Sequence, residues 1–520
     1  MNRGDPINNV DVATTPGFSA VETLIARDRL DEPASESAPH KFIRDVAFSN
    51  LPVPFQKVRT YLWLVVLTRA LGPSGFGAWS LFIVTLSTLT TISTMNCGSC
   101  LMRFVSGERS PDEVDQAFST VLAMVLGASA IIAAALVAFS RQIAMAIFGS
   151  TAASGLVILL AVVLICESVF EEMKNILRAR RLNQSWAYFC FARLLPETAA
   201  VLAFAWWLGS VHSATDAYAF VSVCSVAGGM FYLRSRRRIR LARPNIRLVS
   251  KYVSYGLPLL PGVFASAVSL GADKYVVSYY LGLKEVGIYG VCFALSAGVF
   301  FLTGPINDVL FPELSALYDT EMWPTFRQRF QGVQKFVFCF AVCAAAILVA
   351  FPHQVLTLVA PAEFSEGAAT LAVLGFQGIF MALVLLYVVI LNIRLRVWST
   401  TVFWVLSGAA IILLDVVFVP QLGILGAALG QLIATAAGAL VLVAMHWNLF
   451  MQTFEWVWFG QTGVACASVF AVSLVCKYLA ESAATDFLQI AAGTAAFVAC
   501  LFATGYVTRN DLQRLVKVFA

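Results

Sequence analysis

Long apolar stretches recur along this chain, each about 20 residues in length and able to cross the ~30 Å hydrocarbon core of a bilayer as a helix. The runs are continuous and lack the polar–apolar alternation of membrane β-barrel strands. The sequence therefore predicts an all-α polytopic membrane protein with about 14 transmembrane helices. We place these spans near 46–68, 76–98, 117–140, 153–173, 186–208, 214–233, 256–281, 286–310, 333–352, 366–391, 398–419, 422–446, 460–480 and 486–508.

The composition supports this fold class and argues against a soluble enzyme. Hydrophobic residues make up 59% of the chain and charged residues 12%, against roughly 25% charged in an ordinary globular domain. No Walker A, GxSxG or HExxH motif is present, and no loop is long enough for a catalytic domain. The 11 cysteines lie in apolar stretches and the four histidines are scattered. We therefore predict neither an enzyme nor a bound cofactor or metal.

Basic residues in the loops predict the topology. Loops on one side of the predicted spans hold 22 Lys and Arg residues, and those on the other side hold four. Positive residues favour the cytoplasmic side, so both termini are predicted to be cytoplasmic in a cell inner membrane protein. Residues 1–41 are acidic and rich in Pro and Ser, which predicts a disordered cytoplasmic tail. The basic run Arg234–Arg247 lacks aromatics, so we interpret it as a linker near anionic lipid, with no nucleic acid partner.

A short motif recurs at an offset of 210 residues. Leu71–Trp79 and Leu281–Tyr289 both fit LGxxxxGx[WY], and both lie at the turn after the first span of a six-span block. Six spans return the chain to the same side, so the repeat predicts two pseudo-symmetric six-helix lobes with a site between them. The predicted divisions are the tail 1–41, an N-terminal lobe 42–233, a linker 234–255, a C-terminal lobe 256–446, and helices 13 and 14 with the C-terminus at 447–520.

Charged residues inside predicted spans are the candidate site. Lys57 and Arg59 lie within the first span, and Asp273 and Lys274 lie in the seventh, which is its equivalent in the repeat. A cation at the bilayer centre costs about 2.5–3.5 kcal/mol on insertion scales, so it usually faces a cavity or a partner. Cations on both lobes favour an anionic cargo such as a lipid phosphate or pyrophosphate. Alternatively, Lys274 pairs with Asp273, and Lys57 extends along its stem to the interface.

Further charges lie within spans or near their ends. Arg193 and Glu197 are four residues apart on one predicted helix, a spacing at which they can pair. Any of the acidic residues could be a proton or Na⁺ coupling group, and the sequence does not rank them. The full set is Glu167, Arg193, Glu197, Asp308 and Asp415.

Four segments carry a resemblance to a known family. They are Leu67–Leu81 (LTRALGPSGFGAWSL), Asp273-Lys274 with the following Leu281-Gly282 and Gly287-Ile288-Tyr289, Val419-Pro420 with Gly423–Ala428, and Arg103 after the second span. Together with the number of spans, they resemble the polysaccharide-biosynthesis transporters. These are the Wzx-type oligosaccharide flippases of the multidrug/oligosaccharidyl-lipid/polysaccharide exporter (MOP) superfamily.

The resemblance implies a flippase that moves an undecaprenyl-pyrophosphate-linked oligosaccharide by alternating access around a central cationic cavity. Lys57, Arg59 and Lys274 would contact the pyrophosphate or acidic sugars, and Asp273 and Arg103 complete the predicted substrate-binding set. The implied partners are this lipid-linked oligosaccharide, membrane lipids, and the polymerase and glycosyltransferases of the polysaccharide. Two alternatives stay open at this point: an ion-coupled small-molecule or drug exporter on the same fold, and a membrane scaffold that transports nothing.

Overall fold

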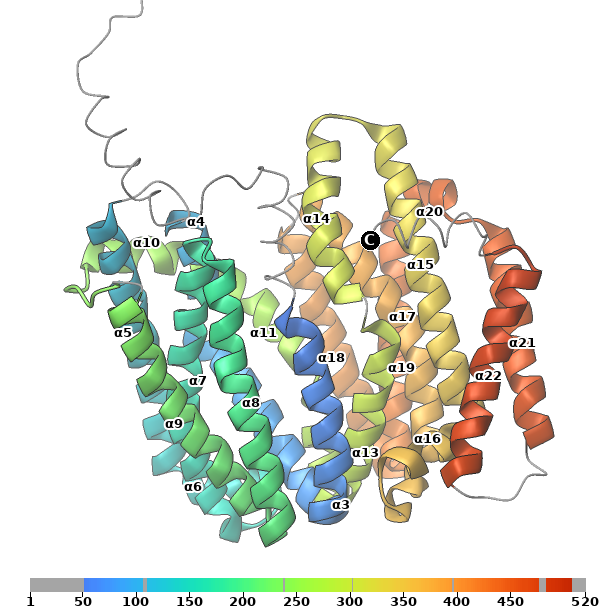
Figure 1. Ribbon diagram of the computed structural model, residues 1–520, viewed down its shortest axis with the longest axis horizontal. Coiled ribbons are helices and arrows are strands. Elements are labelled where there is room, and N and C mark those ends of the chain that lie inside the picture. The colour runs from blue at the N-terminus through green and yellow to red at the C-terminus, as the bar shows by residue number, and fades with distance from the viewer. Residues whose placement is uncertain are drawn as a thin grey trace, which may run out of the picture.

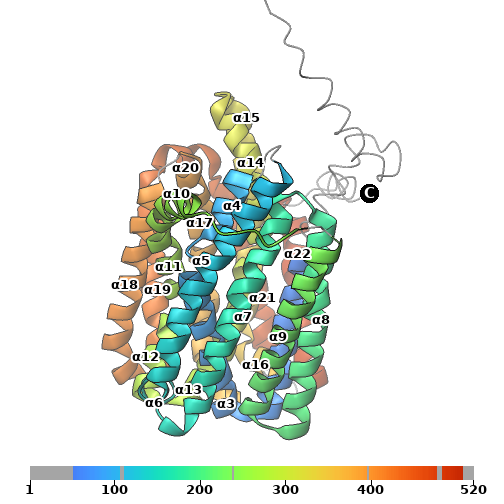
Figure 2. The same ribbon diagram turned by 90° about the vertical axis from the view of Figure 1, so that its left-hand side faces the viewer.

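The computed structural model describes residues 51–105, 110–236, 239–301, 303–394, 397–476 and 483–506. Within these ranges the chain is helical, and no strand occurs among them. The long helices run side by side along one direction (Figures 1 and 2). The predicted tail at 1–41 lies outside the described residues, as do parts of the predicted linker and of the segment 447–520.

The first half of the chain forms the helices of the N-terminal lobe, on the left of Figure 1. They are α3 (Pro52–Thr94), α4 (Cys97–Val105), α5 (Pro111–Ala138), α6 (Ser140–Phe148), the 3-10 turn η1 (Thr151–Ala153), α7 (Ser154–Ala179), α8 (Asn183–Leu208) and α9 (Val211–Arg236).

The second half of the chain forms the C-terminal lobe and two further long helices beyond it, α21 and α22, which lie at the far right of Figure 1. The elements are α10 (Ile246–Gly256), η2 (Leu257–Leu259), α11 (Leu260–Ser269), α12 (Ala272–Leu281), α13 (Leu283–Ser296), η3 (Ala297–Phe300), α14 (Thr303–Asp319), α15 (Trp323–Ala350), α16 (Pro352–Val359), η4 (Ala362–Gly367), α17 (Ala368–Ile393), α18 (Val397–Leu422), α19 (Ile424–Met445), α20 (Trp447–Thr453), α21 (Trp456–Cys476) and α22 (Ala483–Ala503).

The order and lengths of the helices repeat between the two lobes. Helices α5 and α15 each have 28 residues, α7 and α17 each have 26, and α8 and α18 also have 26 each. The short helices α6 and α16 follow α5 and α15 in the same way. Helices α21 and α22 pack on α15 and α16 and follow the second set of helices, outside this repeat. The predicted two-lobed, all-α fold is therefore confirmed, while the residue numbers of the lobe boundaries stay predictions.

Twelve helices of the described part of the chain are long and apolar enough to cross a membrane. The difference from about 14 has a local origin. Two predicted spans lie in the single 43-residue helix α3, on either side of Gly72. A third, 256–281, is divided among η2, α11 and α12, each too short to be counted alone. The predicted number of crossings is therefore approximate.

The repeated motif forms the same turn in both lobes. Gly72 has φ 65° and ψ −178°, and Gly282 has φ 88° and ψ −178°. A positive φ of this kind is open to glycine and strained for residues with a Cβ. Pro73 then follows Gly72 at the start of the second segment of α3, where its missing N–H is not needed. The repeat seen in the sequence is therefore a repeat of backbone geometry.

The two motifs also meet in space. A Cβ on Gly77 would lie 2.0 Å from the carbonyl oxygen of Leu283, and a Cβ on Gly287 would lie 2.0 Å from that of Pro73. Pro73 and Leu283 are equivalent positions at the offset of 210 residues. The reciprocal contact places α3 and α13 backbone to backbone, as small residues allow in membrane helix packing. A pseudo-twofold axis therefore passes between Gly77 and Gly287.

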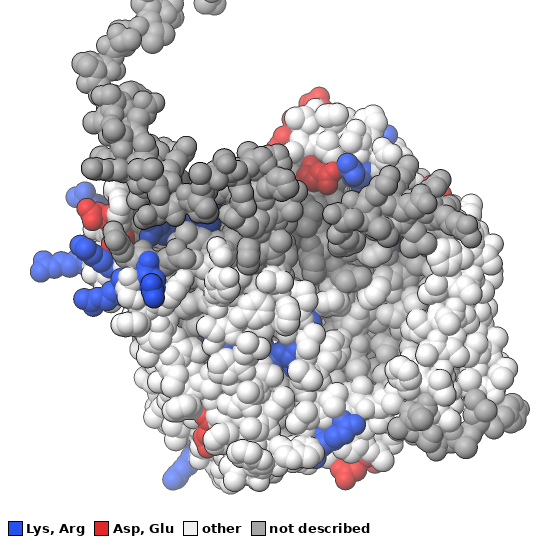
Figure 3. Space-filling view, viewed as in Figure 1, with Lys and Arg blue, Asp and Glu red and all other residues white. Residues whose placement is uncertain are grey.

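The molecule has two ends, which we name the α4 end, where α4 and α10 lie, and the turn end, where α6 lies (Figures 1 and 2). The turn at Gly282 belongs to the turn end, because Ser278, one helical turn earlier, donates to the carbonyl of Ile147 in α6. Most of the charged side chains in Figure 3 gather toward these ends and leave a largely uncharged band between them. Arg69 joins the lobes at the turn end, because its guanidinium donates to the last carbonyls of α16, those of Leu358 at 3.1 Å and Val359 at 2.7 Å. The lobes are thus held together at the turn end.

Candidate functional site

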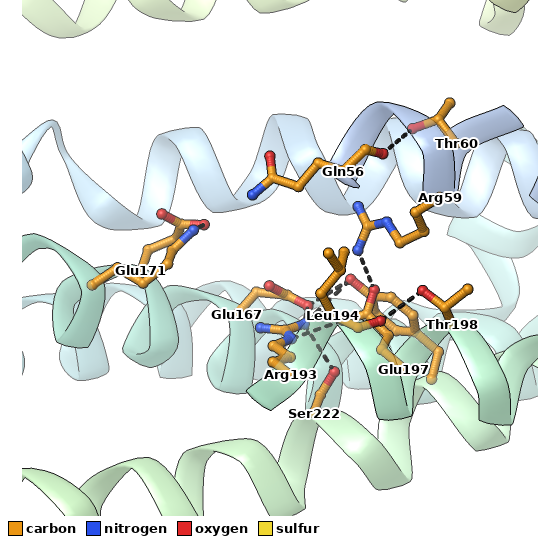
Figure 4. A network of polar contacts seen from close by, with 12 residues as sticks. Gln56, Arg59, Thr60, Glu167, Glu171, Arg193, Leu194, Glu197, Thr198 and Ser222 are labelled. Atoms are coloured by element: carbon orange, nitrogen blue, oxygen red, sulfur yellow. Dashed lines mark hydrogen bonds and ion pairs between the residues drawn. The ribbon is translucent and has the colours of Figure 1, made fainter. Parts of the chain in front are cut away.

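A network of ion pairs lies inside the N-terminal lobe, centred on Arg193 of α8 (Figure 4). The Nε of Arg193 donates to Glu197, one turn along the same helix, at 2.8 Å, and its Nη2 donates to Glu167 of α7. Tyr218 of α9 donates to the same Glu167 oxygen at 2.6 Å. The spacing of Arg193 and Glu197 in the sequence had indicated their pairing, and the structure contains it. The network ties α7, α8 and α9 together.

Arg59 of α3 adds a second cation to this network. Its Nη1 donates to Glu197 at 2.5 Å, and its guanidinium lies over the Trp63 ring at 4.5 Å from the centroid. The side chain of Glu197 is 1% exposed, so it accepts from two arginines away from the surface. With Glu167 and Arg193 included, two cations meet two carboxylates. The intramembrane cation predicted at Arg59 therefore has a charged partner.

Lys57, two residues earlier on α3, points to the other lobe. It is exposed, and its Nζ lies 5.6 Å from the centre of the Phe301 ring, which follows η3. The first segment of α3 stands between the two groups of helices in Figure 1. One helix therefore presents Arg59 to the N-terminal lobe and Lys57 to the C-terminal lobe.

The C-terminal lobe holds its charges differently. Asp273 of α12 is buried and accepts hydrogen bonds from Tyr289, from Gln431 at 3.2 Å and from the backbone N–H of Lys274 at 2.8 Å. Lys274 is also buried, with its Nζ 5.3 Å from the Phe293 ring centroid. Among the described side chains, no carboxylate lies within 4.0 Å of its Nζ. The alternative interpretation of a direct Lys274–Asp273 ion pair is therefore not what this structure contains.

Asp415 of α18 is fully buried, and neither of its oxygens has a hydrogen-bond partner among the described residues. A Cβ on Gly430 would lie 2.4 Å from its Oδ1, so the glycine makes the space that the carboxylate fills. A buried polar atom without a partner carries a free-energy cost of about 1–3 kcal/mol. Sequence reasoning had named Asp415 as one of several charges, without a reason to set it apart.

Arg103, the fifth residue of the predicted substrate-binding set, lies on α4, at the α4 end of the N-terminal lobe. Its guanidinium stacks on Tyr255 of α10, 4.7 Å from the ring centroid. No described contact joins it to the other four predicted residues. Asp273 and Lys274 therefore lie together in the C-terminal lobe. Arg59 lies with Glu197 and Arg193, which were outside the predicted substrate-binding set. Arg103 lies apart from all of them.

Two cavities adjoin the network in the N-terminal lobe. The smaller, of about 190 Å³, is lined by both arginines of the network and by Lys174. The larger, of about 460 Å³, is lined by Glu171, Glu172 and a row of hydroxyl side chains, and the described part of its wall contains no Lys or Arg. Both share Glu167, Glu171 and Tyr218. The sequence did not predict the larger cavity. The signal that could have indicated it is the run STLTTIST at 87–94, which is unusually rich in hydroxyls for an apolar span.

These features define a class of membrane protein fold. The fold is similar to that of solved flippases and multidrug exporters of the MOP superfamily. A lipid II flippase MurJ in an inward closed conformation matches with a TM-score of 0.65 at 15% identity, over 88% of this chain and 98% of that one. An inward-facing multidrug resistance MATE transporter matches with a TM-score of 0.60 at 14% identity, over 82% of this chain and 98% of that one. At such identities the likeness establishes the fold alone.

The chain belongs to the polysaccharide biosynthesis protein family, whose model matches residues 44–318, just over half of its length. A curated relative, the probable flippase AglR of Haloferax volcanii, is 24% identical over 176 residues. That alignment covers 33% of this chain and 36% of the relative, so the chain spans about a third of the length of the relative that it matches. The resemblance drawn from the sequence is therefore confirmed at the level of the family.

Proposed function

We propose that this protein flips a polyprenyl-pyrophosphate-linked oligosaccharide across the inner membrane for the synthesis of a surface polysaccharide. Family membership supports a flippase. One observation supports a pyrophosphate cargo: the first segment of α3 presents Arg59 to one lobe and Lys57 to the other. Lys57 lies at the lobe interface and Arg59 lines the smaller cavity of the N-terminal lobe, so a pyrophosphate that reaches both cations has an oxygen for each. We take the lobe boundaries from the helical repeat: the N-terminal lobe runs from α3 to α9 and the C-terminal lobe from α11 to α19. The linker between them is α10 with the basic segment before it.

The contacts at the turn end support an alternating-access mechanism. Gly77 and Gly287 hold the lobes together there, and Arg69 bonds to the end of α16. By the distribution of basic residues, the turn end is periplasmic and both termini are cytoplasmic. The described conformation is then closed to the periplasm. Release of the cargo requires the lobes to part at these contacts, with the α4 end closing in exchange.

The test uses a strain in which the gene for this protein is deleted and then restored with variants. Arg59→Ala removes the cation that α3 contributes to the smaller cavity, and we expect it to abolish polymer export while lipid-linked oligosaccharide accumulates. Arg59→Lys keeps the charge and should retain part of the export. Arg329→Ala is the matched control, because Arg329 is an exposed arginine paired with Glu313 outside the proposed site. Membrane levels of each variant are measured by immunoblot. Normal export in a well-expressed Arg59→Ala strain would contradict the proposed cargo site.

A second function on the same fold is an ion-coupled exporter of cationic small molecules. The larger cavity of the N-terminal lobe favours it, because three glutamates line that cavity and no Lys or Arg is among its described lining residues. Drug susceptibility of the deletion strain discriminates between the two. A susceptibility change with unaltered surface polysaccharide supports the exporter, and loss of polysaccharide with unaltered susceptibility supports the flippase. If the deletion changes both the surface polysaccharide and the drug susceptibility, and also lowers the amounts of other membrane proteins, the protein is a scaffold.

A further inference from the structure

A third cavity lies in the C-terminal lobe, at the α4 end of the molecule, where α14, α15 and α20 come together (Figures 1 and 2). Its volume is about 310 Å³, and it shares no lining residue with the two cavities of the N-terminal lobe. Its polar wall contains Arg327 of α15, Arg394 at the end of α17, and Asn448 and Gln452 of α20. The four side chains come from three helices and line one space.

The two arginines of this cavity are not neutralised by the protein. Among the described residues, no carboxylate lies within 4.0 Å of the guanidinium of Arg327 or Arg394, and no Asp or Glu lines the cavity. Arg329, two residues further along α15, does have a partner, because its Nε donates to Glu313 of α14 at 3.0 Å. Like charges at one cavity repel each other, and an anion bound between them replaces that repulsion by attraction. The cavity therefore favours an anion.

The donors around the cavity suit a phosphate group. A guanidinium presents a planar fork of N–H donors that matches phosphate oxygens. Asn448 and Gln452 are four residues apart on α20, so their amides lie on one face of that helix and add N–H donors to the same space. All four side chains are exposed, so a ligand can reach them.

The rest of the wall and the surface beside it are apolar, which favours a lipid over a soluble anion. Next to the amides, α20 carries Trp447 and Met451, again four residues apart, which are 53% and 49% exposed. An exposed tryptophan beside a polar stripe is typical of a helix at the headgroup level of a membrane. The cavity therefore opens at headgroup depth. Its apolar lining residues include Phe326, Ile390, Ile393 and Leu449.

We infer that this cavity binds the phosphate of an anionic phospholipid between Arg327 and Arg394, with the first acyl carbons against the apolar wall. The lipid comes from the leaflet at the α4 end, which the proposed topology makes the cytoplasmic leaflet. One bound headgroup contacts α15, the end of α17 and α20, and so joins three helices of the C-terminal lobe. This lipid site lies outside the cavities of the N-terminal lobe and goes beyond the proposed transport function.

Native mass spectrometry of the full-length, delipidated protein in detergent tests this inference. The probes are phosphatidylglycerol and phosphatidylcholine with identical acyl chains. We expect the wild type to bind phosphatidylglycerol about tenfold more tightly than phosphatidylcholine. Arg327→Gln and Arg394→Gln each remove one charge and should weaken phosphatidylglycerol about fivefold, without a change for phosphatidylcholine. Arg327→Lys keeps the charge and should retain most of the preference.

Arg329→Gln is the matched control, because it removes the same charge from the same helix but outside the cavity. It should keep the wild-type preference. Equal losses in Arg329→Gln and Arg327→Gln would overturn the inference, as would a wild type that binds both lipids alike. Thermal unfolding is the second measurement: phosphatidylglycerol should raise the Tm of the wild type and of Arg329→Gln more than that of Arg327→Gln, since a ligand stabilises the state that binds it.

Two further probes separate a phospholipid from other carriers of phosphate. Glycerol phosphate should displace phosphatidylglycerol only in large excess, because it lacks the acyl chains that contact the apolar wall. Displacement at the concentration of the lipid itself would assign the cavity to a soluble anion. Undecaprenyl phosphate should bind no more tightly than phosphatidylglycerol, and tighter binding that Arg327→Gln weakens would assign the cavity to the carrier of the cargo.

These measurements do not depend on export, so the lipid site and the proposed function can fail separately. A preference for phosphatidylglycerol that depends on Arg327 and Arg394, in a protein whose deletion leaves polysaccharide intact, would retain the lipid site and remove the flippase. Loss of polysaccharide on deletion, combined with a protein that binds both lipids alike, would retain the flippase and remove the lipid site.

Discussion

The two lobes share a backbone plan but differ in how they hold charge. Both turn at a left-handed glycine in the same motif, Gly72 in one lobe and Gly282 in the other. In the N-terminal lobe, Arg59 and Arg193 pair with two glutamates. In the C-terminal lobe, Asp273 is held by neutral donors, while Lys274 and Asp415 have no ion-pair partner among the described residues.

This difference indicates distinct roles for the lobes. The N-terminal network crosslinks α3, α7, α8 and α9 and holds the cavities in a fixed shape. In the C-terminal lobe, the buried Lys274 and Asp415 raise the free energy of this conformation, because each is charged or polar and lacks a full set of partners. A different conformation or a bound ligand can recover that free energy. The C-terminal lobe is therefore the one whose state should respond to the transport cycle.

The largest effect on stability should follow from removing one charge of the N-terminal lobe, where the charges are paired. Arg193→Met leaves Glu167 without its cation and Glu197 with Arg59 alone, and breaking a buried pair in this way costs about 3–5 kcal/mol. Lys274→Met removes a buried cation that has no described carboxylate partner, so it should change the free energy of unfolding by no more than about 1 kcal/mol. Unfolding by denaturant in micelles measures both. Equal losses for the two variants would erase the distinction between the lobes.

Within the C-terminal lobe, the two buried aspartates should respond differently to the same substitution. Asp273→Asn disturbs hydrogen bonds from Tyr289, Gln431 and the Lys274 backbone, and it should lose roughly 1.5–3 kcal/mol of stability. Asp415→Asn removes no described hydrogen bond, and it should be neutral or gain about 1 kcal/mol. Unfolding of each variant beside the wild type checks the difference. A larger loss at Asp415 than at Asp273 would mean that the Asp415 carboxylate has a partner in the folded state.

The turns should respond alike if the symmetry is real. Gly77→Ala and Gly287→Ala each place a methyl group against a backbone carbonyl of the other lobe, and we expect each to lose about 1–3 kcal/mol, as overpacked sites do. Gly127→Ala on α5 is the control, because nothing lies within 4 Å of its added Cβ, and it should gain about 0.5–1 kcal/mol. A loss at only one of the two positions would contradict the pseudo-twofold axis.

The sequence was sufficient for the fold because its signals are local. Apolar length identifies the spans, and the LGxxxxG motif identifies the repeat, since only glycine suits the left-handed turn at Gly72 and Gly282. The mutual contact of Gly77 and Gly287 was not predicted, because the repeat shows which residues are equivalent and not which of them touch. The break of 256–281 into short helices was missed, since a hydropathy window does not register a local interruption such as Gly271.

The site was harder to predict because it depends on contacts between distant segments. Arg193 and Glu197 share a helix, so their pairing followed from spacing. Arg59 and Glu197 are 138 residues apart, and no pattern in either segment connects them. Glu172 looks like one more acidic residue at the end of a span, and only its burial and missing partner set it apart. Arg103 was included by resemblance to the family, which does not position a side chain.

The smallest effect on stability should come from Lys57, the exposed cation that faces the C-terminal lobe. Lys57→Ala should change the free energy of unfolding by no more than ~0.5 kcal/mol, because its side chain is exposed and forms no described ion pair. In reconstituted vesicles it should raise the apparent KM for a polyprenyl-pyrophosphate cargo about fivefold, the equivalent of ~1 kcal/mol for a solvated charge pair. The increase should shrink as salt rises, since screening weakens exposed charges, and Lys57→Arg should restore the wild-type KM. An unchanged KM at low salt would limit the cargo-binding charges to the N-terminal network and to Lys274.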